Sequence, residues 1–216
     1  MLPANIVQNM EKAGVVAVLT VDDAQDAVPV ARALHAGGVS VIELTFRTAA
    51  AQESIRRIRA EVPEVVVGAG TLLNRAQVAD ALKAGAFFGV APGCNPATLQ
   101  AAKEIGLPFA PGVMTPSDVE IALTHDCRVL KFFPAETSGG LNHLKTMSAP
   151  FNHLGVRYLP LGGVSAANLK DYLSSPLVLG VGGSWLAPVD LIRKKDWAAI
   201  QQRATEASQI VRAVRP

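Results

Sequence analysis

A single lysine interrupts an apolar run in the second half of the chain. The stretch RVLKFFPAE, residues 128–136, has the composition of a buried strand apart from Lys131. Burying an unpaired ammonium costs free energy, so a lysine in such a place requires a partner or a chemical purpose. An amine in an apolar pocket can attack a carbonyl carbon and form a Schiff base. Lys131 is therefore the first candidate catalytic residue.

A carboxylate occupies an equivalent place in an earlier apolar run, VIELTFRT, residues 41–48. Side chains alternate along a strand, so if Leu130 and Phe132 pack against helices, Lys131 points to the opposite face. The same alternation turns Glu43 toward that face. A glutamate beside the amine could move protons as a general acid and base. A purely structural ion pair is the alternative, because buried pairs also occur without a catalytic role.

Two glycine-rich stretches in the last third of the chain suit phosphate binding. LGGVS, residues 161–165, and GVGGSW, residues 180–185, each follow an apolar run. Glycine lets backbone N–H groups approach a phosphate closely. Tight turns would explain either stretch alone, but two of them after the last two strands favour a phosphate site.

The overall composition favours a small-molecule partner. Half of the residues are apolar and the formal net charge is +2, which argues against a disordered chain and against an electrostatic nucleic-acid binder. No stretch is typical of a signal peptide or a membrane span. Cys94 and Cys127 are the only cysteines, which predicts neither a disulfide framework nor a four-ligand metal set. A reducing cytoplasm is the expected location.

Short β-branched runs alternate with amphipathic segments along the whole chain, as expected of repeated βα units. Asparagine or threonine before proline, at Asn95-Pro96 and Thr115-Pro116, predicts helix starts. Pro29 lies inside a helix expected over residues 24–36 and predicts a kink there. The eight expected strands are Val15 to Leu19, Val39 to Leu44, Val65 to Gly68, Phe87 to Val90, Pro108 to Pro111, Val129 to Phe132, Tyr158 to Leu161 and Leu177 to Gly180.

Eight βα units without a linker predict one α/β domain over residues 1–216, a TIM (β/α)8 barrel with an N-terminal helix. A doubly wound open sheet is the alternative. The active site of such a barrel lies at the carboxyl ends of its strands. Strands two and six lie across the barrel from each other, so Glu43 and Lys131 are expected to converge there.

The motifs together resemble those of the 2-keto-3-deoxy-6-phosphogluconate (KDPG) aldolase family, also assigned 4-hydroxy-2-oxoglutarate (KHG) aldolase activity. The resemblance runs over nearly the whole chain. It is carried by VIELTFRT (41–48), VGAGTLLN (67–74), APG (91–93), KFFPAE (131–136), GGVS (162–165) and GGSWL (182–186).

The resemblance implies a class I aldolase that cleaves KDPG to pyruvate and D-glyceraldehyde 3-phosphate, as in the Entner–Doudoroff route. It implies a homotrimer that needs neither a metal nor another cofactor. Lys131 would be the Schiff-base lysine and Glu43 the general acid and base. The substrate-binding residues that it implies are Arg47 and Thr71 for the pyruvate carboxylate, Pro92 and Phe133 for the pocket lining, and Gly162, Gly163 and Ser184 for the phosphate. Leu161, Gly182 and Gly183 are further candidate substrate-binding residues.

One position departs from the family pattern. The family usually has a threonine immediately before the glycines of the LGGVS stretch, and this chain has Leu161. The substrate and its configuration at C4 therefore stay open. The alternatives are an aldolase for the C4 epimer, 2-dehydro-3-deoxy-6-phosphogalactonate, an aldolase for KHG, or a catalytically silent barrel that binds a sugar phosphate.

Overall fold

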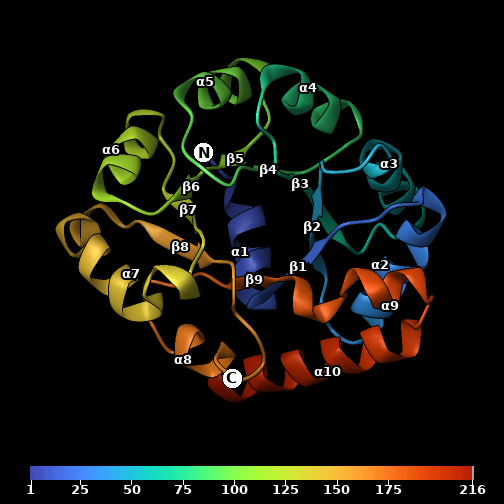
Figure 1. Cartoon of the computed structure of the whole chain (residues 1–216). Coiled ribbons are helices and arrows are strands. Elements are labelled where there is room, and N and C mark those ends of the chain that lie inside the picture. Colours follow the sequence, from blue (N-terminus) through green and yellow to red (C-terminus); the bar gives the residue numbers. More distant parts are fainter. Residues whose placement is uncertain (216) are drawn as a thin grey trace.

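The computed structural model describes residues 1–215, in which parallel strands alternate with α-helices. Helices surround the strands in Figure 1. The strands are β1 (Val15–Leu19), β2 (Val41–Thr45), β3 (Val66–Gly70), β4 (Gly89–Val90), β5 (Phe109–Ala110), β6 (Gly112–Val113), β7 (Val129–Phe132), β8 (Arg157–Pro160) and β9 (Val181–Gly183). The α-helices are α1 (Ala4–Ala13), α2 (Ala27–Ala36), α3 (Ala51–Glu61), α4 (Arg75–Lys83), α5 (Pro96–Ile105), α6 (Pro116–Thr124), α7 (Gly140–Ser148), α8 (Leu169–Leu173), α9 (Val189–Arg193) and α10 (Trp197–Val214).

The strands form two hydrogen-bonded sheets. Six strands pair in the order β5-β4-β3-β2-β1-β9, and three pair in the order β6-β7-β8. All of these pairs are parallel, as the βα repeat predicts. The α/β class is confirmed.

The predicted closed eight-stranded TIM barrel is wrong. The hydrogen-bonded ladder is interrupted at Pro111, which separates β5 from β6 and has no N–H to donate. It is interrupted again beside β9, where only the isolated bridges Tyr158–Val178 and Leu161–Gly182 join the two sheets. Several strands are only two residues long, so they provide too few bonds to continue the ladder.

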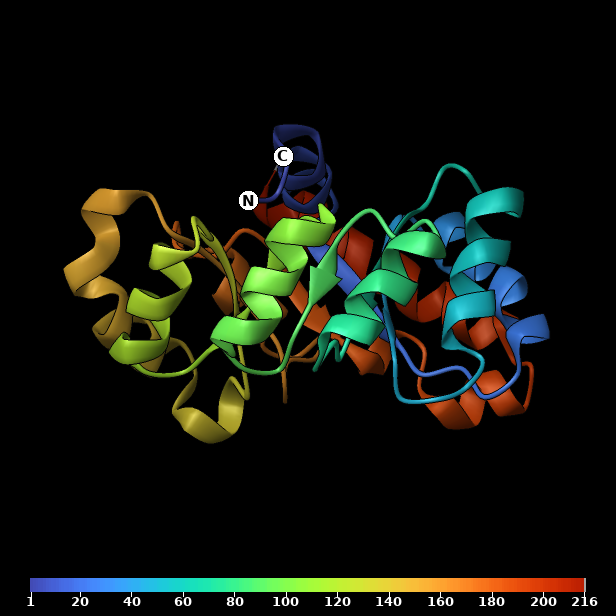
Figure 2. The same ribbon diagram turned by 90° about the horizontal axis from the view of Figure 1, so that it is seen from above.

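Side chains alternate between two faces along the strands, as predicted. The apolar residues of the two faces form two clusters. Ile42 and Leu130 belong to the larger cluster, in which the outer faces of the strands pack against helices such as α3. Val41 and Leu159 belong to the inner cluster, which Ile6 of α1 joins. Helix α1 crosses the centre of the view in Figure 1 and projects from one side of the molecule in Figure 2. The N-terminal helix thereby covers part of the inner faces of the strands.

Helix starts follow the predicted signals, with one exception. Thr115 caps α6 in a capping box with Asp118, and the Asn95 side chain accepts from the Ala97 N–H at the start of α5. The expected helix over residues 24–36 instead begins as a 3-10 turn, Ala24–Asp26, followed by α2. Pro29 therefore lies in the first turn of α2, where an N–H would have no intrahelical acceptor, so its missing N–H costs no helical hydrogen bond, and the predicted kink inside a longer helix is wrong.

Within the described residues, no helix combines the length and the apolar character that crossing a bilayer requires.

Candidate active site

A cavity of about 180 Å³ lies at the carboxyl ends of the strands. It gathers side chains from β1, β2, β7 and β9 and from the loops that follow β3, β4 and β8. All of the sequence-predicted site residues line it except Gly163. The lining residues are Val18, Glu43, Thr45, Arg47, Thr71, Pro92, Lys131, Phe133, Leu161, Gly162, Gly182, Gly183 and Ser184.

The structure brings Lys131 and Glu43 together in this cavity. Lys131 Nζ donates a hydrogen bond of 3.0 Å to Glu43 Oε1, and their side chains are only 7% and 3% exposed. The two strands that carry them belong to different sheets, so the pair crosses the interior. Lys131 Nζ also lies 5.4 Å from the centre of the Phe133 ring. An amine and a carboxylate thus share one desolvated site.

A glycine on β3 makes room for the carboxylate. A Cβ atom added at Gly70 would lie 2.2 Å from Glu43 Oε1 and 2.6 Å from Glu43 Cγ. Gly70 pairs in register with Thr45, two residues beyond Glu43 on the neighbouring strand. Only glycine therefore permits the observed side-chain position of Glu43, which crosses the face of β3 toward Lys131.

Arg47 follows β2 and lies exposed at the mouth of the cavity. Its Nη2 donates to Thr20 Oγ1 at 2.7 Å, and its Nε donates to Thr45 Oγ1 at 3.3 Å. Thr20 and Thr45 also share a hydrogen bond of 2.9 Å between their hydroxyls. Thr71 follows the neighbouring strand β3 and also lines the cavity, with a positive φ of 60°, an uncommon conformation for a threonine.

The loop after β8 turns through two successive glycines in the left-handed region, with φ of +93° at Gly162 and +83° at Gly163. Backbone bonds of Ala135 N–H to Leu161 O, 2.7 Å, and of Glu136 N–H to Gly162 O, 3.0 Å, fasten it to the loop after β7. A Cβ at Gly163 would lie 2.6 Å from Glu136 Cβ. Gly163 therefore packs against the neighbouring loop, outside the cavity lining.

Three residues near the site were missed by the reasoning from sequence. Thr45 and Val18 line the cavity, and Thr20 holds Arg47 without lining it. Thr20 comes directly after the first strand, so the rule that functional groups follow strand ends could have found it. Val18 carries no polar group that would mark it.

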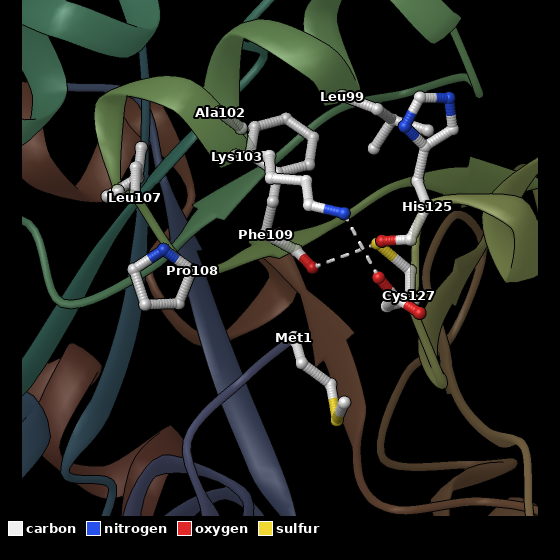
Figure 3. A pocket seen from close by; sticks show the side chains of 11 residues that line it. Met1, Leu99, Ala102, Lys103, Leu107, Pro108, Phe109, His125 and Cys127 are labelled. Atoms are coloured by element: carbon white, nitrogen blue, oxygen red, sulfur yellow. Dashed lines mark hydrogen bonds and ion pairs between the residues drawn. The ribbon is translucent and has the colours of Figure 1, made fainter.

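A second cavity, of about 220 Å³, lies at the amino ends of β5 and β7 (Figure 3). Lys103 and Asp126 form an ion pair of 3.2 Å there, and both are more than 60% exposed. The Cys127 thiol faces the carbonyls of Phe109 and His125, and burial raises its pKa above the ordinary value. Burial therefore disfavours the reactive thiolate form of Cys127.

No cluster of three or more His, Cys, Asp or Glu side chains suited to a metal ion occurs among residues 1–215. The charged groups of the first cavity are Glu43, Arg47 and Lys131. The cavity thus brings together an amine, a carboxylate and a guanidinium.

Comparison with proteins of known sequence identifies relatives over most of the chain. A sequence model described as KDPG and KHG aldolase matches residues 6–203. The KHG/KDPG aldolase of Escherichia coli is 45% identical over 193 residues, which cover 89% of this chain and 90% of that protein. The 2-dehydro-3-deoxy-phosphogluconate aldolase of Pseudomonas aeruginosa is 43% identical over 196 residues, 91% of this chain and 88% of that one.

Solved structures agree with these relatives. The KDPG aldolase of Zymomonas mobilis with 3-phosphoglycerate superposes with a TM-score of 0.89 at 42% identity, covering 97% of this chain and 98% of the other. The KDPG aldolase of Legionella pneumophila, with pyruvate captured as a covalent carbinolamine intermediate, gives 0.88 at 33% identity, with coverages of 93% and 97%. The chain therefore belongs to the KDPG and KHG aldolase family.

Proposed function

We propose that the protein is a class I aldolase that cleaves KDPG reversibly to pyruvate and D-glyceraldehyde 3-phosphate. The observation that carries the proposal is the buried contact of 3.0 Å between Lys131 Nζ and Glu43 Oε1 inside a cavity. A Legionella relative whose pyruvate is captured as a carbinolamine supports the same chemistry.

The reaction begins at the amine. Glu43 takes a proton from the Lys131 ammonium, and the neutral Nζ attacks the C2 ketone of the substrate. The carbinolamine that forms loses its hydroxyl as water, with Glu43 returning the proton. The product is an iminium ion, whose positive nitrogen can accept the electron pair of a breaking bond.

Cleavage follows at the bond between C3 and C4. Glu43 takes the proton of the C4 hydroxyl, the aldehyde leaves, and the electron pair moves through C3 and C2 to the nitrogen. The resulting enamine takes a proton at C3, and water hydrolyses the pyruvate imine to regenerate Lys131. One amine and one carboxylate therefore suffice for every proton transfer.

The remaining residues of the cavity hold the ends of the substrate in this proposal. Arg47 and Thr71 bind the pyruvate carboxylate, because a guanidinium fork fits two carboxylate oxygens. Pro92, Phe133 and Leu161 form apolar walls. The phosphate lies beside four lining residues, Gly162, Gly182, Gly183 and Ser184. Gly163 does not line the cavity, and its left-handed conformation turns the loop that carries Gly162.

The buried, apolar side chain of Leu161 leaves the preferred substrate to be tested. It offers no hydrogen bond to the hydroxyls of the sugar chain, so KHG and the C4 epimer of KDPG are the competing substrates. Values of kcat/KM with the three substrates decide among them. We expect kcat/KM for KDPG to be at least about tenfold higher than kcat/KM for KHG, since a bound phosphate adds charge-assisted hydrogen bonds. An equal rate with KHG would contradict the phosphate site.

We also propose that the chain is one domain, assembles as a homotrimer and acts in the cytoplasm. The trimer comes from the family resemblance, and the location comes from the cysteine content. Sedimentation velocity at several protein concentrations tests the assembly, with one species of three times the mass of the chain as the expected result. A monomer at all concentrations would contradict it.

A further inference from the structure

The guanidinium of Arg47 is held along one edge and open along the other. Among residues 1–215, no carboxylate lies within ion-pair distance of Arg47. Its bonds go to two neutral hydroxyls, Thr45 Oγ1 from Nε and Thr20 Oγ1 from Nη2. The positive charge therefore remains available to an anion at the mouth of the cavity.

Counting donors identifies the open edge. A guanidinium has five N–H groups, one on Nε and two on each Nη. The two threonines take the Nε–H and one N–H of Nη2, which together form the side edge of the fork. The other N–H of Nη2 and both N–H groups of Nη1 remain. A carboxylate that accepts two parallel bonds must therefore approach the end of the fork, through Nη1 and Nη2.

The threonines are themselves fixed by neighbouring strands. Leu19 of β1 pairs in register with Leu44 of β2, so the next residues, Thr20 and Thr45, lie side by side. Their hydroxyls share a bond of 2.9 Å, and Thr45 is 2% exposed. Two rigid strand ends thus hold an arginine that otherwise lies exposed.

We propose that Thr20 and Thr45 are positioning residues that orient Arg47 so that the Nη1/Nη2 end of its guanidinium meets the carboxylate of the substrate. The proposal rests on the proposed function, which assigns that carboxylate to Arg47. Thr20 is the cleaner of the two to test, because it does not line the cavity while Thr45 does.

The test uses Thr20→Val, which keeps the β-branched shape and removes the hydroxyl, with Thr20→Ser as the matched control that keeps the hydroxyl. Full-length proteins are incubated with pyruvate over a range of concentrations and reduced with borohydride, and the adduct on Lys131 is quantified by mass spectrometry. For Thr20→Val we expect the half-saturating pyruvate concentration to rise about tenfold and kcat for cleavage to change less than about threefold. Thr20→Ser should stay within about twofold of the unsubstituted protein.

A double substitution separates positioning from a direct role. In the background of Arg47→Met, adding Thr20→Val should raise the half-saturating concentration by less than about twofold, because Thr20 then has no guanidinium to orient. If the two substitutions raise the half-saturating concentration by factors that multiply, the proposal is overturned. It is also overturned if Thr20→Val alone leaves the half-saturating concentration unchanged. Failure of the unsubstituted protein to form any adduct on Lys131 would instead overturn the proposed function. Equal melting temperatures of the variants exclude a loss of folding as the cause.

Discussion

Two lysine–carboxylate ion pairs of nearly equal length lie at opposite ends of the strands. Lys131 and Glu43 are 3.0 Å apart at the carboxyl ends, and Lys103 and Asp126 are 3.2 Å apart at the amino ends, where Figure 3 shows the second cavity. The first pair is 7% and 3% exposed, and the second is 62% and 64% exposed. Distance alone therefore does not distinguish them.

Because the two pairs differ in burial, they differ in their expected effect on the free energy of unfolding. Water screens the outer pair, so its contribution to the free energy of unfolding is at most about 1 kcal/mol. Breaking a buried pair from one side typically costs about 3–5 kcal/mol, because the remaining charge is left without a partner. A buried amine and carboxylate beside a cavity are typical of a catalytic site, whereas the outer pair is ordinary surface.

The largest effect is expected for the buried amine. Lys131→Ala should reduce the rate of KDPG cleavage at least about a thousandfold, because no other group can form the imine. Pyruvate release, followed with a coupled dehydrogenase, measures the rate. Circular dichroism checks that the variant is folded. Unfolding at room temperature would indicate that the pair is mainly structural, and residual cleavage near the original rate would refute the role of Lys131.

The next largest effect is expected for the carboxylate. Glu43→Gln keeps the shape of the side chain and should slow cleavage about a hundredfold or more, which is the usual contribution of a general acid and base. The pyruvate adduct on Lys131 should still form, because the attacking amine is present, but more slowly, since Glu43 also moves the protons of imine formation; its rate should fall less than the rate of cleavage. The amplitude and the rate of adduct formation are compared with the cleavage rate. Equal loss of both would count against a separate role for Glu43 in the cleavage step.

A smaller effect is expected for the glycine that makes room for Glu43. Gly70→Ala introduces a Cβ that would lie 2.2 Å from Glu43 Oε1, so the carboxylate must move away from Lys131. Overpacking of this kind should lower the free energy of unfolding by about 1–3 kcal/mol. Cleavage should slow about tenfold. Gly106→Ala is the comparison, because nothing lies within 4 Å of an added Cβ there. At Gly106→Ala the strain comes only from the positive φ of 84°.

The outer pair should give the smallest effect. Lys103→Ala should change the free energy of unfolding by less than about 0.5 kcal/mol and leave the cleavage rate unchanged. Urea titration and the same coupled assay measure the two quantities. A double-mutant cycle with Asp126→Asn should give a coupling energy near zero, whereas the cycle for Lys131 and Glu43 should give about 2 kcal/mol or more. Equal coupling energies in the two cycles would contradict the inferred difference between the buried and the exposed ion pair.

The site residues were easier to predict than the sheet. The alternation of polar and apolar side chains indicated that Lys131 and Glu43 face the same interior, whereas Arg47, Thr71 and Ser184 came from the family resemblance. The position of Thr20 directly after the first strand could have marked it, but its bond to Arg47 depends on the register with a neighbouring strand, which a single sequence does not display. The roles assigned to these side chains remain predictions.

Closure of the sheet could not be predicted from a count of strands. The eighth strand was expected at residues 177–180, but β9 comprises Val181–Gly183. Gly180 instead packs against the backbone, where an added Cβ would lie 3.0 Å from the Gly14 carbonyl oxygen. The strand expected over Pro108 to Pro111 is likewise shorter, because β5 ends at Ala110, and a strand that was not expected, β6, begins after Pro111. Both corrections depend on which N–H groups find an acceptor, and hydropathy does not report that.

The central claim is that Lys131 forms a covalent imine. The most direct test incubates the full-length protein with pyruvate and borohydride and locates the modified residue by peptide mass spectrometry. The account predicts a carboxyethyl group on Lys131 and none on Lys103, although each amine is about 3 Å from a carboxylate. An unmodified Lys131 at saturating pyruvate, or equal labelling of the two lysines, would contradict it.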